Sequence, residues 1–179
     1  MKKLIIRKKI FRLRKERYSD NIQIDFKSII KILKKKEYTK KIVGGYYSYN
    51  YEINVLPILK KFESLKYPLC LPKINKNSKM NFFSWSTNDP LCVNKYGIPE
   101  PINNNVKYPD ILLVPLVAYD KNSNRIGYGG GFYDRYIKRI KKIKKVITIG
   151  LAYSFQRIKK IPIDKHDIKL DFIITEKNK

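Results

Sequence analysis

Cysteine is scarce in this sequence of 179 residues, which has only Cys70 and Cys92. Because the two do not form a close Cys-x-x-Cys pair, the sequence predicts neither a disulfide framework nor a zinc site, and it suits a reducing cytoplasm. No stretch approaches the roughly twenty apolar residues that span a membrane, and the basic N-terminus lacks an apolar run long enough for a signal peptide. We therefore expect a cytoplasmic protein that does not bind membranes.

Acidic residues are also few, at 15 Asp and Glu against 40 Lys and Arg, which gives a formal net charge of +25. Alone, this balance would predict a nucleic-acid partner. However, the excess is mostly lysine spread from end to end, accompanied by the isoleucine, asparagine and tyrosine that A/T-rich codons encode, so compositional bias explains it without a specific nucleic acid. A nucleic-acid-binding protein stays an alternative, because 14 Tyr and 8 Phe could stack on bases.

The periodicity of apolar residues predicts alternating helices and strands. One helical run begins at Phe26, with Asp20 and Asn21 upstream as possible caps. Further helices are expected at the N-terminus and at residues 54–65 and 133–140. Strands are expected at residues 42–49, 67–71, 81–85, 111–114, 146–150 and 172–175. Strands separated by helices indicate an α/β class, a layered α/β/α single domain over residues 1–179 with a largely parallel central sheet.

Residues 86–109 interrupt this alternation. They hold four of the nine prolines and few apolar residues, so they predict a long connection that crosses one end of the sheet. Long connections in compact domains are often functional.

The most distinctive stretch is RIGYGGGFYDR, from Arg125 to Arg135, between an expected strand and an expected helix. Its four glycines allow positive φ angles and a close approach of the backbone to a ligand. The helix that follows directs its free N–H groups and its positive dipole end towards an anion. Asp134, in its first turn, could bind a hard cation that also binds phosphates. The stretch therefore predicts a polyphosphate site with a magnesium ligand.

Two common nucleotide motifs are excluded at this loop. A P-loop requires Gly-Lys-Ser/Thr after its last glycine, whereas this chain has Gly131-Phe132-Tyr133. A dinucleotide-binding fingerprint requires a third spaced glycine where Phe132 stands. A glycine-rich turn that only joins a strand to a helix remains an alternative.

Residues 108–135, YPDILLVPLVAYDKNSNRIGYGGGFYDR, resemble the signature of the 5-formyltetrahydrofolate cyclo-ligase family. The similar features are an apolar strand, a Val-Pro turn, an Asp-x-x-Ser-Asn-Arg turn and the glycine-rich loop. Further similar blocks are Lys3-x-x-x-Arg7, Glu52-Ile53, Gly97-Ile98-Pro99-Glu100-Pro101 and His166-Asp167. The resemblance covers nearly the whole chain, although Leu116 and Tyr96 depart from the residues common in the family.

This resemblance implies an enzyme that converts 5-formyltetrahydrofolate and ATP into 5,10-methenyltetrahydrofolate, ADP and phosphate through phosphorylation of the formyl oxygen. It implies ATP as co-substrate and Mg²⁺ as cofactor, with catalysis by positioning and charge neutralisation rather than by a side-chain nucleophile. We expect a monomer. A catalytically silent scaffold of the same fold is a further alternative.

Carried over by position, the resemblance assigns three groups of residues. Those implied to bind ATP are Lys3, Arg7, Arg125, Ile126, Gly127, Tyr128, Gly129, Gly130, Gly131, Phe132 and Tyr133. Those implied to bind the folate substrate are Tyr47, Glu52, Tyr128, Gly129, Gly130, Gly131 and Phe132. The implied metal ligands are Asp134 and Asp167.

Each assignment has a structural alternative. Lys3 and Arg7 could lie on a solvated helix face, Asp134 could simply complement the helix dipole, and Tyr47 could belong to the core.

Glu52 suits a pterin ring because a carboxylate can accept hydrogen bonds from two neighbouring N–H donors.

Overall fold

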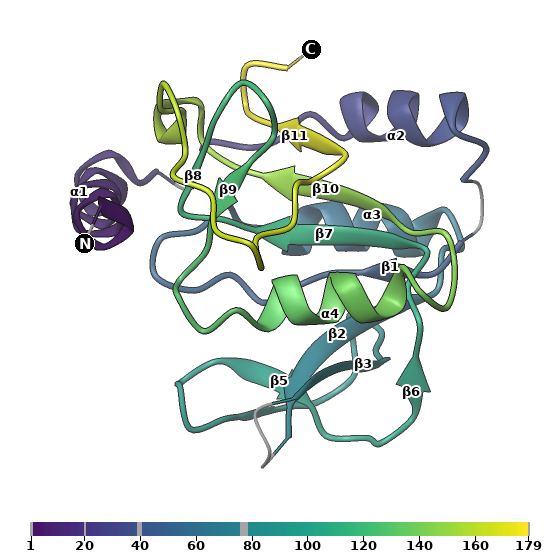
Figure 1. Cartoon of the computed structure of the whole chain (residues 1–179). Helices are drawn as coiled ribbons and strands as arrows, with labels where there is room; N and C mark the ends of the chain where they lie inside the picture. Colours follow the sequence, from purple (N-terminus) through teal and green to yellow (C-terminus); the bar gives the residue numbers. More distant parts are fainter. Residues whose placement is uncertain (1, 20, 39–40, 76–78, 179) are drawn as a thin grey trace.

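Seven strands form the central sheet, in the order β11-β10-β7-β1-β2-β3-β6 (Figure 1). This computed structural model describes residues 2–19, 21–38, 41–75 and 79–178. The strands are β1 (Val43–Gly44), β2 (Leu69–Ile74), β3 (Met80–Ser84), β6 (Val106–Lys107), β7 (Ile111–Pro115), β10 (Ile147–Leu151) and β11 (Phe172–Ile174). The five strands from β11 to β2 pair in parallel, and β3 pairs antiparallel with both β2 and β6. The predicted α/β class with a largely parallel sheet is confirmed.

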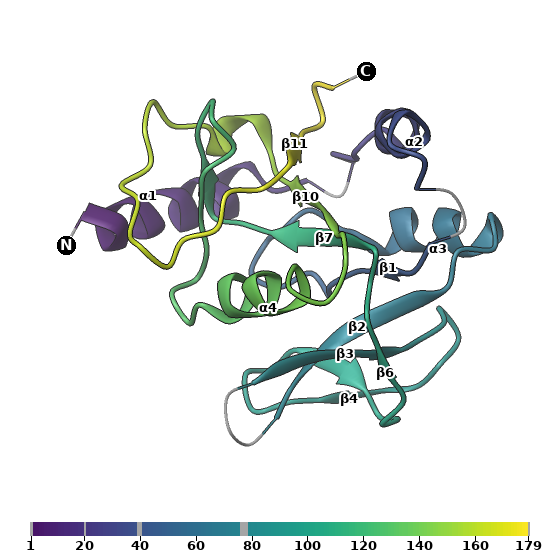
Figure 2. The ribbon, with the colours of Figure 1, turned by 45° about the vertical axis from the view of Figure 1, so that its right-hand side comes forward.

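Helices cover both faces of this sheet, as the views in Figures 1 and 2 show. Helices α2 (Phe26–Lys35) and α3 (Leu56–Ser64) pack on the face that presents Ile111 and Leu113. Helix α4 (Phe132–Ile140) packs on the opposite face against Leu112 and Val114. Because β7 lies between two layers of helices, its apolar run is buried on both sides, as expected for a central parallel strand.

Helix α1 (Lys2–Arg17) does not pack on the sheet. It lies beside a small hairpin of β8 (Ala118–Tyr119) and β9 (Arg125–Ile126) (Figure 1). Ile10 joins the apolar cluster between them. A short 3-10 helix, η1 (Ser154–Gln156), follows β10. Since β9 leads directly into the glycine-rich loop, this packing places α1 beside that loop.

Two local predictions were wrong in their bounds. The strand expected at residues 42–49 spans only Val43–Gly44, and the chain then passes so close to α3 that a Cβ on Gly45 would approach Leu59 Cδ1 to 2.7 Å. The cap of α2 is Asp25, whose carboxylate accepts a hydrogen bond from Lys27 N at 3.0 Å. Asn21 lies too far upstream to cap this helix, and Asp20 lies outside the described residues.

The prediction of a plain connection at residues 86–109 was also wrong. The segment contains β6 and a hairpin of β4 (Leu91–Val93) and β5 (Pro99–Pro101). Both strands of the hairpin form a separate two-stranded sheet, where proline is tolerated because its missing N–H removes no bond from a central ladder. Within the described residues, no helix combines the length and the apolar character that crossing a membrane requires.

Candidate active site

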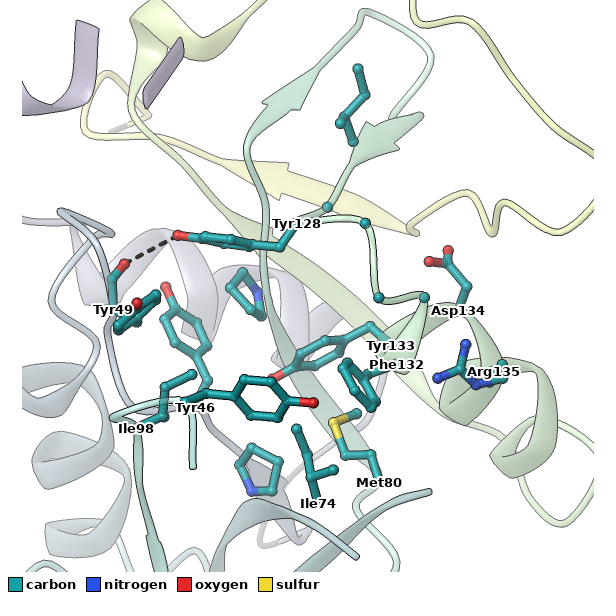
Figure 3. A pocket seen from close by; sticks show the side chains of 18 of the residues that line it. Tyr46, Tyr49, Ile74, Met80, Ile98, Tyr128, Phe132, Tyr133, Asp134 and Arg135 are labelled. Atoms are coloured by element: carbon teal, nitrogen blue, oxygen red, sulfur yellow. Dashed lines mark hydrogen bonds between the residues drawn. The ribbon is translucent and has the colours of Figure 1, made fainter. Parts of the chain in front are cut away.

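A cavity of about 920 Å³ opens where the parallel strands β1 and β7 end. Its wall includes Pro115 at the end of β7, residues of the segment that follows β1, and the glycine-rich loop before α4 (Figure 3). Open parallel sheets bind ligands at the carboxyl ends of their strands. Every residue that the resemblance assigns to ATP, folate or metal lines this one cavity.

The glycine-rich loop adopts backbone angles that favour glycine. Gly129 has a φ of 116° and Gly131, the N-cap of α4, a φ of 64°. A Cβ on Gly131 would come within 2.8 Å of Arg135 Nη1, and one on Gly129 would lie 3.5 Å from Arg7 Cζ. The backbone of the loop therefore lies close to two guanidinium groups, an arrangement that suits phosphate groups.

Helix α1 supplies cations to this end of the cavity. Lys3 and Arg7 are four residues apart and share one helix face. Arg7 Nε donates to the carbonyl of Gly127 at 2.7 Å, and Lys3 Nζ lies 2.5 Å from Asp167 Oδ2 and 2.6 Å from Asp164 Oδ2. The alternative of a solvated helix face is thus wrong for both side chains.

Asp134 stabilises a buried cation. Its Oδ1 lies 2.9 Å from Arg125 Nη2 and accepts a second hydrogen bond, of 3.0 Å, from Ile168 N. The Arg125 side chain is only 3% exposed, so this pair offsets the cost of burying a charge. Asp134 therefore joins β9, α4 and the segment before β11.

The carboxylates at this end fit a magnesium ion that is shared with phosphates. Among the residues that the structure describes, no three His, Cys, Asp or Glu side chains form a metal cluster. Mg²⁺ does not need one, because it commonly binds through one or two carboxylates together with phosphate oxygens and water. Asp134 and Asp167 both line the cavity and offer such oxygens.

Glu52 lies at the other side of the cavity, after β1 and before α3, and is buried. Its Oε2 accepts a hydrogen bond from Tyr49 N at 3.0 Å. Burial raises the pKa of Glu52 to about 7, while the charge of Arg14, the Tyr49 N–H and the Tyr128 hydroxyl each lower it. A buried carboxylate can recognise a ligand by accepting hydrogen bonds from it, because little water competes for these bonds.

The raised pKa of Glu52 predicts a pH-dependent stability. Protonated Glu52 contributes to the free energy of unfolding. This contribution is fully present when the pH is below 4.5, the ordinary pKa of the group, and is lost as the pH rises through about 7. Glu52→Gln removes the titration, so without ligands the variant should melt above wild type at about pH 8 and close to it near pH 4.5, with a difference of roughly 3 kcal/mol at most. An equal gap in melting temperature at both pH values would contradict the buried, titrating carboxylate.

Aromatic side chains line the space between Glu52 and the loop. Figure 3 shows the rings of Tyr46, Phe132 and Tyr133 within the cavity, below Tyr128, whose hydroxyl donates to the carbonyl of Tyr49 at 3.2 Å. Such walls suit a flat heterocycle. Tyr47 is half-buried and also lines the cavity, so its side chain is accessible to a ligand there.

The sequence analysis assigned no role to several residues at the site. They include Asp164 and Lys95, which line the cavity, and Arg14, which contacts Tyr128 of the cavity wall. Asp164 and Lys95 have no local signal, but Arg14 has one. Positions 3, 7 and 14 fall on one face of a helix, so the basic residues at this spacing indicate a common cationic face.

Comparison with known proteins identifies the family of this chain. The model of the 5-formyltetrahydrofolate cyclo-ligase family matches residues 1–176. The chain belongs to this family. A 5-formyltetrahydrofolate cyclo-ligase of Haemophilus influenzae is 34% identical over 142 residues, which cover 75% of each chain.

Solved structures of cyclo-ligase relatives have the same fold. The 5,10-methenyltetrahydrofolate synthetase of Aquifex aeolicus superposes with a TM-score of 0.76 at 31% identity, over 99% of this chain and 91% of that one. A 5,10-methenyltetrahydrofolate synthetase of Mycoplasma pneumoniae, at 24% identity, superposes with a TM-score of 0.71 over 99% of this chain and 100% of that one, and shows the fold alone.

Proposed function

We propose that this protein is an ATP-dependent enzyme that cyclises 5-formyltetrahydrofolate to 5,10-methenyltetrahydrofolate, giving ADP and phosphate. The observation that carries this proposal is one cavity in which a cationic glycine-rich loop and a buried carboxylate face the same space, in a chain of the 5-formyltetrahydrofolate cyclo-ligase family. Phosphate groups suit the loop, and a flat ring with N–H donors suits the carboxylate.

The reaction requires activation of an unreactive formyl amide. The formyl oxygen attacks the γ-phosphorus of ATP, the bond from this phosphorus to the ADP oxygen breaks, and an iminium phosphate ester forms. The second folate nitrogen then attacks the formyl carbon and loses its proton, and the carbon–oxygen bond breaks to release phosphate. Since the substrates supply every reacting atom, the protein has to position them and to neutralise charge.

Lys3, Arg7 and the loop from Arg125 to Tyr133 would hold the triphosphate of ATP. Contacts between Arg7 and Gly127 and between Lys3 and Asp167 support this assignment, because they hold both cations at the cavity wall. Guanidinium and ammonium groups at such a backbone turn are typical phosphate ligands.

Glu52 and Tyr47 would bind the folate ring system, with Tyr128, Phe132 and the three glycines between them shared by both substrates. The buried carboxylate of Glu52 can accept hydrogen bonds from two neighbouring pterin N–H groups. With both substrates bound, the shared loop would bring the formyl group of the folate towards the γ-phosphate.

Asp134 and Asp167 would hold Mg²⁺. The ion would supply positive charge to the phosphates of ATP as the γ-phosphoryl group transfers. Asp134 also keeps Arg125 in place, and Asp167 keeps Lys3 in place, so both carboxylates organise the cations of the nucleotide site whether or not the metal is bound.

We further propose that the protein acts as a cytoplasmic monomer, without a nucleic-acid or membrane partner. Cys70 and Cys92 are both free thiols, which persist in a reducing compartment. Neither nucleic-acid binding nor a silent scaffold explains why Glu52 is buried beside a cationic loop.

A direct assay tests this function. The protein is mixed with ATP, Mg²⁺ and 5-formyltetrahydrofolate, and the absorbance of the methenyl product is followed. We expect product only when all three are present. Folate and nucleotide binding without any product would identify the silent scaffold instead.

Arg7→Ala is expected to raise the KM for ATP by roughly tenfold to a hundredfold, because one charge-assisted contact contributes about 1.5–3 kcal/mol. The KM for folate should change little. The matched control is Arg12→Ala, on the same helix but with a side chain 74% exposed. A larger effect on folate than on ATP would reverse the assignment of α1.

A further inference from the structure

Arg14 is an unusual residue in this protein. It is 1% exposed, although arginine side chains are almost never fully buried without a paired group. Its guanidinium lies beside a pair of neighbouring rings, 5.9 Å from the centroid of Phe11 and 5.8 Å from that of Tyr128. Burying a cation destabilises the folded protein unless other groups compensate for the lost water. The groups that contact Arg14 therefore indicate its role.

The contacts of Arg14 lead from α1 into the cavity. Nη1 donates to the Tyr128 hydroxyl at 2.8 Å, and Nη2 donates to the carbonyl of Leu116, just after β7. The same carbonyl accepts a bond of 2.9 Å from Gln156 Nε2. Nε is buried and has no hydrogen-bond partner among the described residues. The guanidinium is thus fixed at two points, one of them in the glycine-rich loop.

The charge of Arg14 also interacts electrostatically with the Glu52 carboxylate. Arg14 favours the ionised form of this carboxylate more than the Tyr49 N–H or the Tyr128 hydroxyl does. Tyr128 itself contacts both sides, since it accepts from Arg14 and donates to the carbonyl of Tyr49, three residues before Glu52. Arg14, Tyr128 and Glu52 therefore form one group across α1, the loop and the segment after β1.

We propose that Arg14 is a positioning residue for folate binding, a role that rests on the proposed function. It fixes Tyr128, and with it the loop, over the folate side of the cavity, and its charge balances the Glu52 carboxylate that receives the ring. Arg14 itself does not touch the reacting atoms. It complements Lys3 and Arg7, which serve the nucleotide from the same helix face.

Several tyrosines lie around Glu52. Tyr46, Tyr128 and Tyr133 come from the segment after β1, the loop and α4, and burial is the main cause that raises the pKa of each above 10. They stay neutral in the neutral pH range. Arg14 is thus a charged neighbour that lowers the pKa of Glu52 against the larger effect of burial.

The test measures the affinity for 5-formyltetrahydrofolate, without ATP, from about pH 6 to about pH 9. Wild type should bind more tightly as Glu52 ionises. Arg14→Met should weaken binding about tenfold at neutral pH and move the midpoint of the pH dependence up by about one pH unit, the usual effect of one neighbouring charge. Arg12→Met, with the same change at an exposed site of α1, should match wild type.

Two further variants separate positioning from charge and from folding. Arg14→Lys keeps the charge but cannot make both hydrogen bonds, to Tyr128 and to Leu116. The midpoint of its pH dependence should stay near that of wild type, while its affinity for folate should fall. In a Glu52→Gln background, Arg14→Met should no longer move any midpoint, and the two losses of affinity should not add. Circular dichroism identifies the folded variants, and Arg14→Lys with Tyr128→Phe carries the test if Arg14→Met does not fold.

An unmoved midpoint in Arg14→Met, or wild-type affinity in both Arg14→Lys and Tyr128→Phe, would overturn the proposal. Fully additive losses in the double variant would also overturn it, since they would make Arg14 a residue that only stabilises the fold. If wild type itself bound no folate, the proposed function would fail instead, and the two failures are distinguishable.

Discussion

Asp134→Asn is expected to lower turnover by roughly tenfold to a hundredfold, with a matching loss in the response to Mg²⁺. The carboxylate has two tasks, because it pairs with the buried Arg125 and would bind the metal. Losing charge-assisted contacts of about 1.5–3 kcal/mol in the transition state gives a rate loss of this size. The measurement is the rate of methenyl product at increasing Mg²⁺ concentrations.

Asparagine is a better choice than alanine at this position. Alanine would leave the Arg125 guanidinium buried without its partner, at a cost of about 3–5 kcal/mol, and could unfold the protein. Asparagine keeps an oxygen for Arg125 and for Ile168 N. Asp89→Asn, in an exposed loop outside the cavity, controls for the change in net charge. Full turnover with an unchanged magnesium response would contradict the metal assignment.

Glu52→Gln is expected to weaken folate binding by roughly tenfold to a hundredfold. Glutamine keeps the size but replaces one acceptor with a donor that would face an N–H group of the ring, and an unsatisfied buried donor costs about 1–3 kcal/mol. ATP binding should hardly change. Calorimetry with each substrate separately measures both affinities.

Glu63→Gln is the matched control for this change. Glu63 also accepts a backbone hydrogen bond, from Thr87 N at 3.0 Å, but it lies outside the cavity. Normal folate affinity in Glu52→Gln would make Glu52 a structural residue that only accepts the bond from Tyr49 N.

The local parts of the site could be predicted from the sequence. The glycine-rich loop is one contiguous stretch of sequence, and its glycines indicate positive φ angles, which Gly129 and Gly131 adopt. The helix that follows is predicted by the periodicity of its apolar residues. The apolar run of β7 likewise predicts a strand that is covered on both faces.

The remaining parts depend on contacts between distant segments. That Asp134 pairs with Arg125 follows from how β9 turns into α4, and that Arg14 is buried follows from the packing of α1 on the β8–β9 hairpin. The β4–β5 hairpin was missed because its prolines disfavour a strand locally, whereas the pairing across the hairpin stabilises it. Local propensity cannot reveal such pairings.

Transfer of the formyl oxygen tests the central claim most directly. In the proposed reaction this oxygen attacks the γ-phosphorus and leaves with the phosphate, so the protein needs both substrates in one cavity. The formyl oxygen of 5-formyltetrahydrofolate is labelled with the heavy oxygen isotope, and the inorganic phosphate released with the methenyl product is analysed by mass spectrometry. One labelled oxygen in each phosphate is the predicted result, and unlabelled phosphate would contradict activation of the formyl group by ATP.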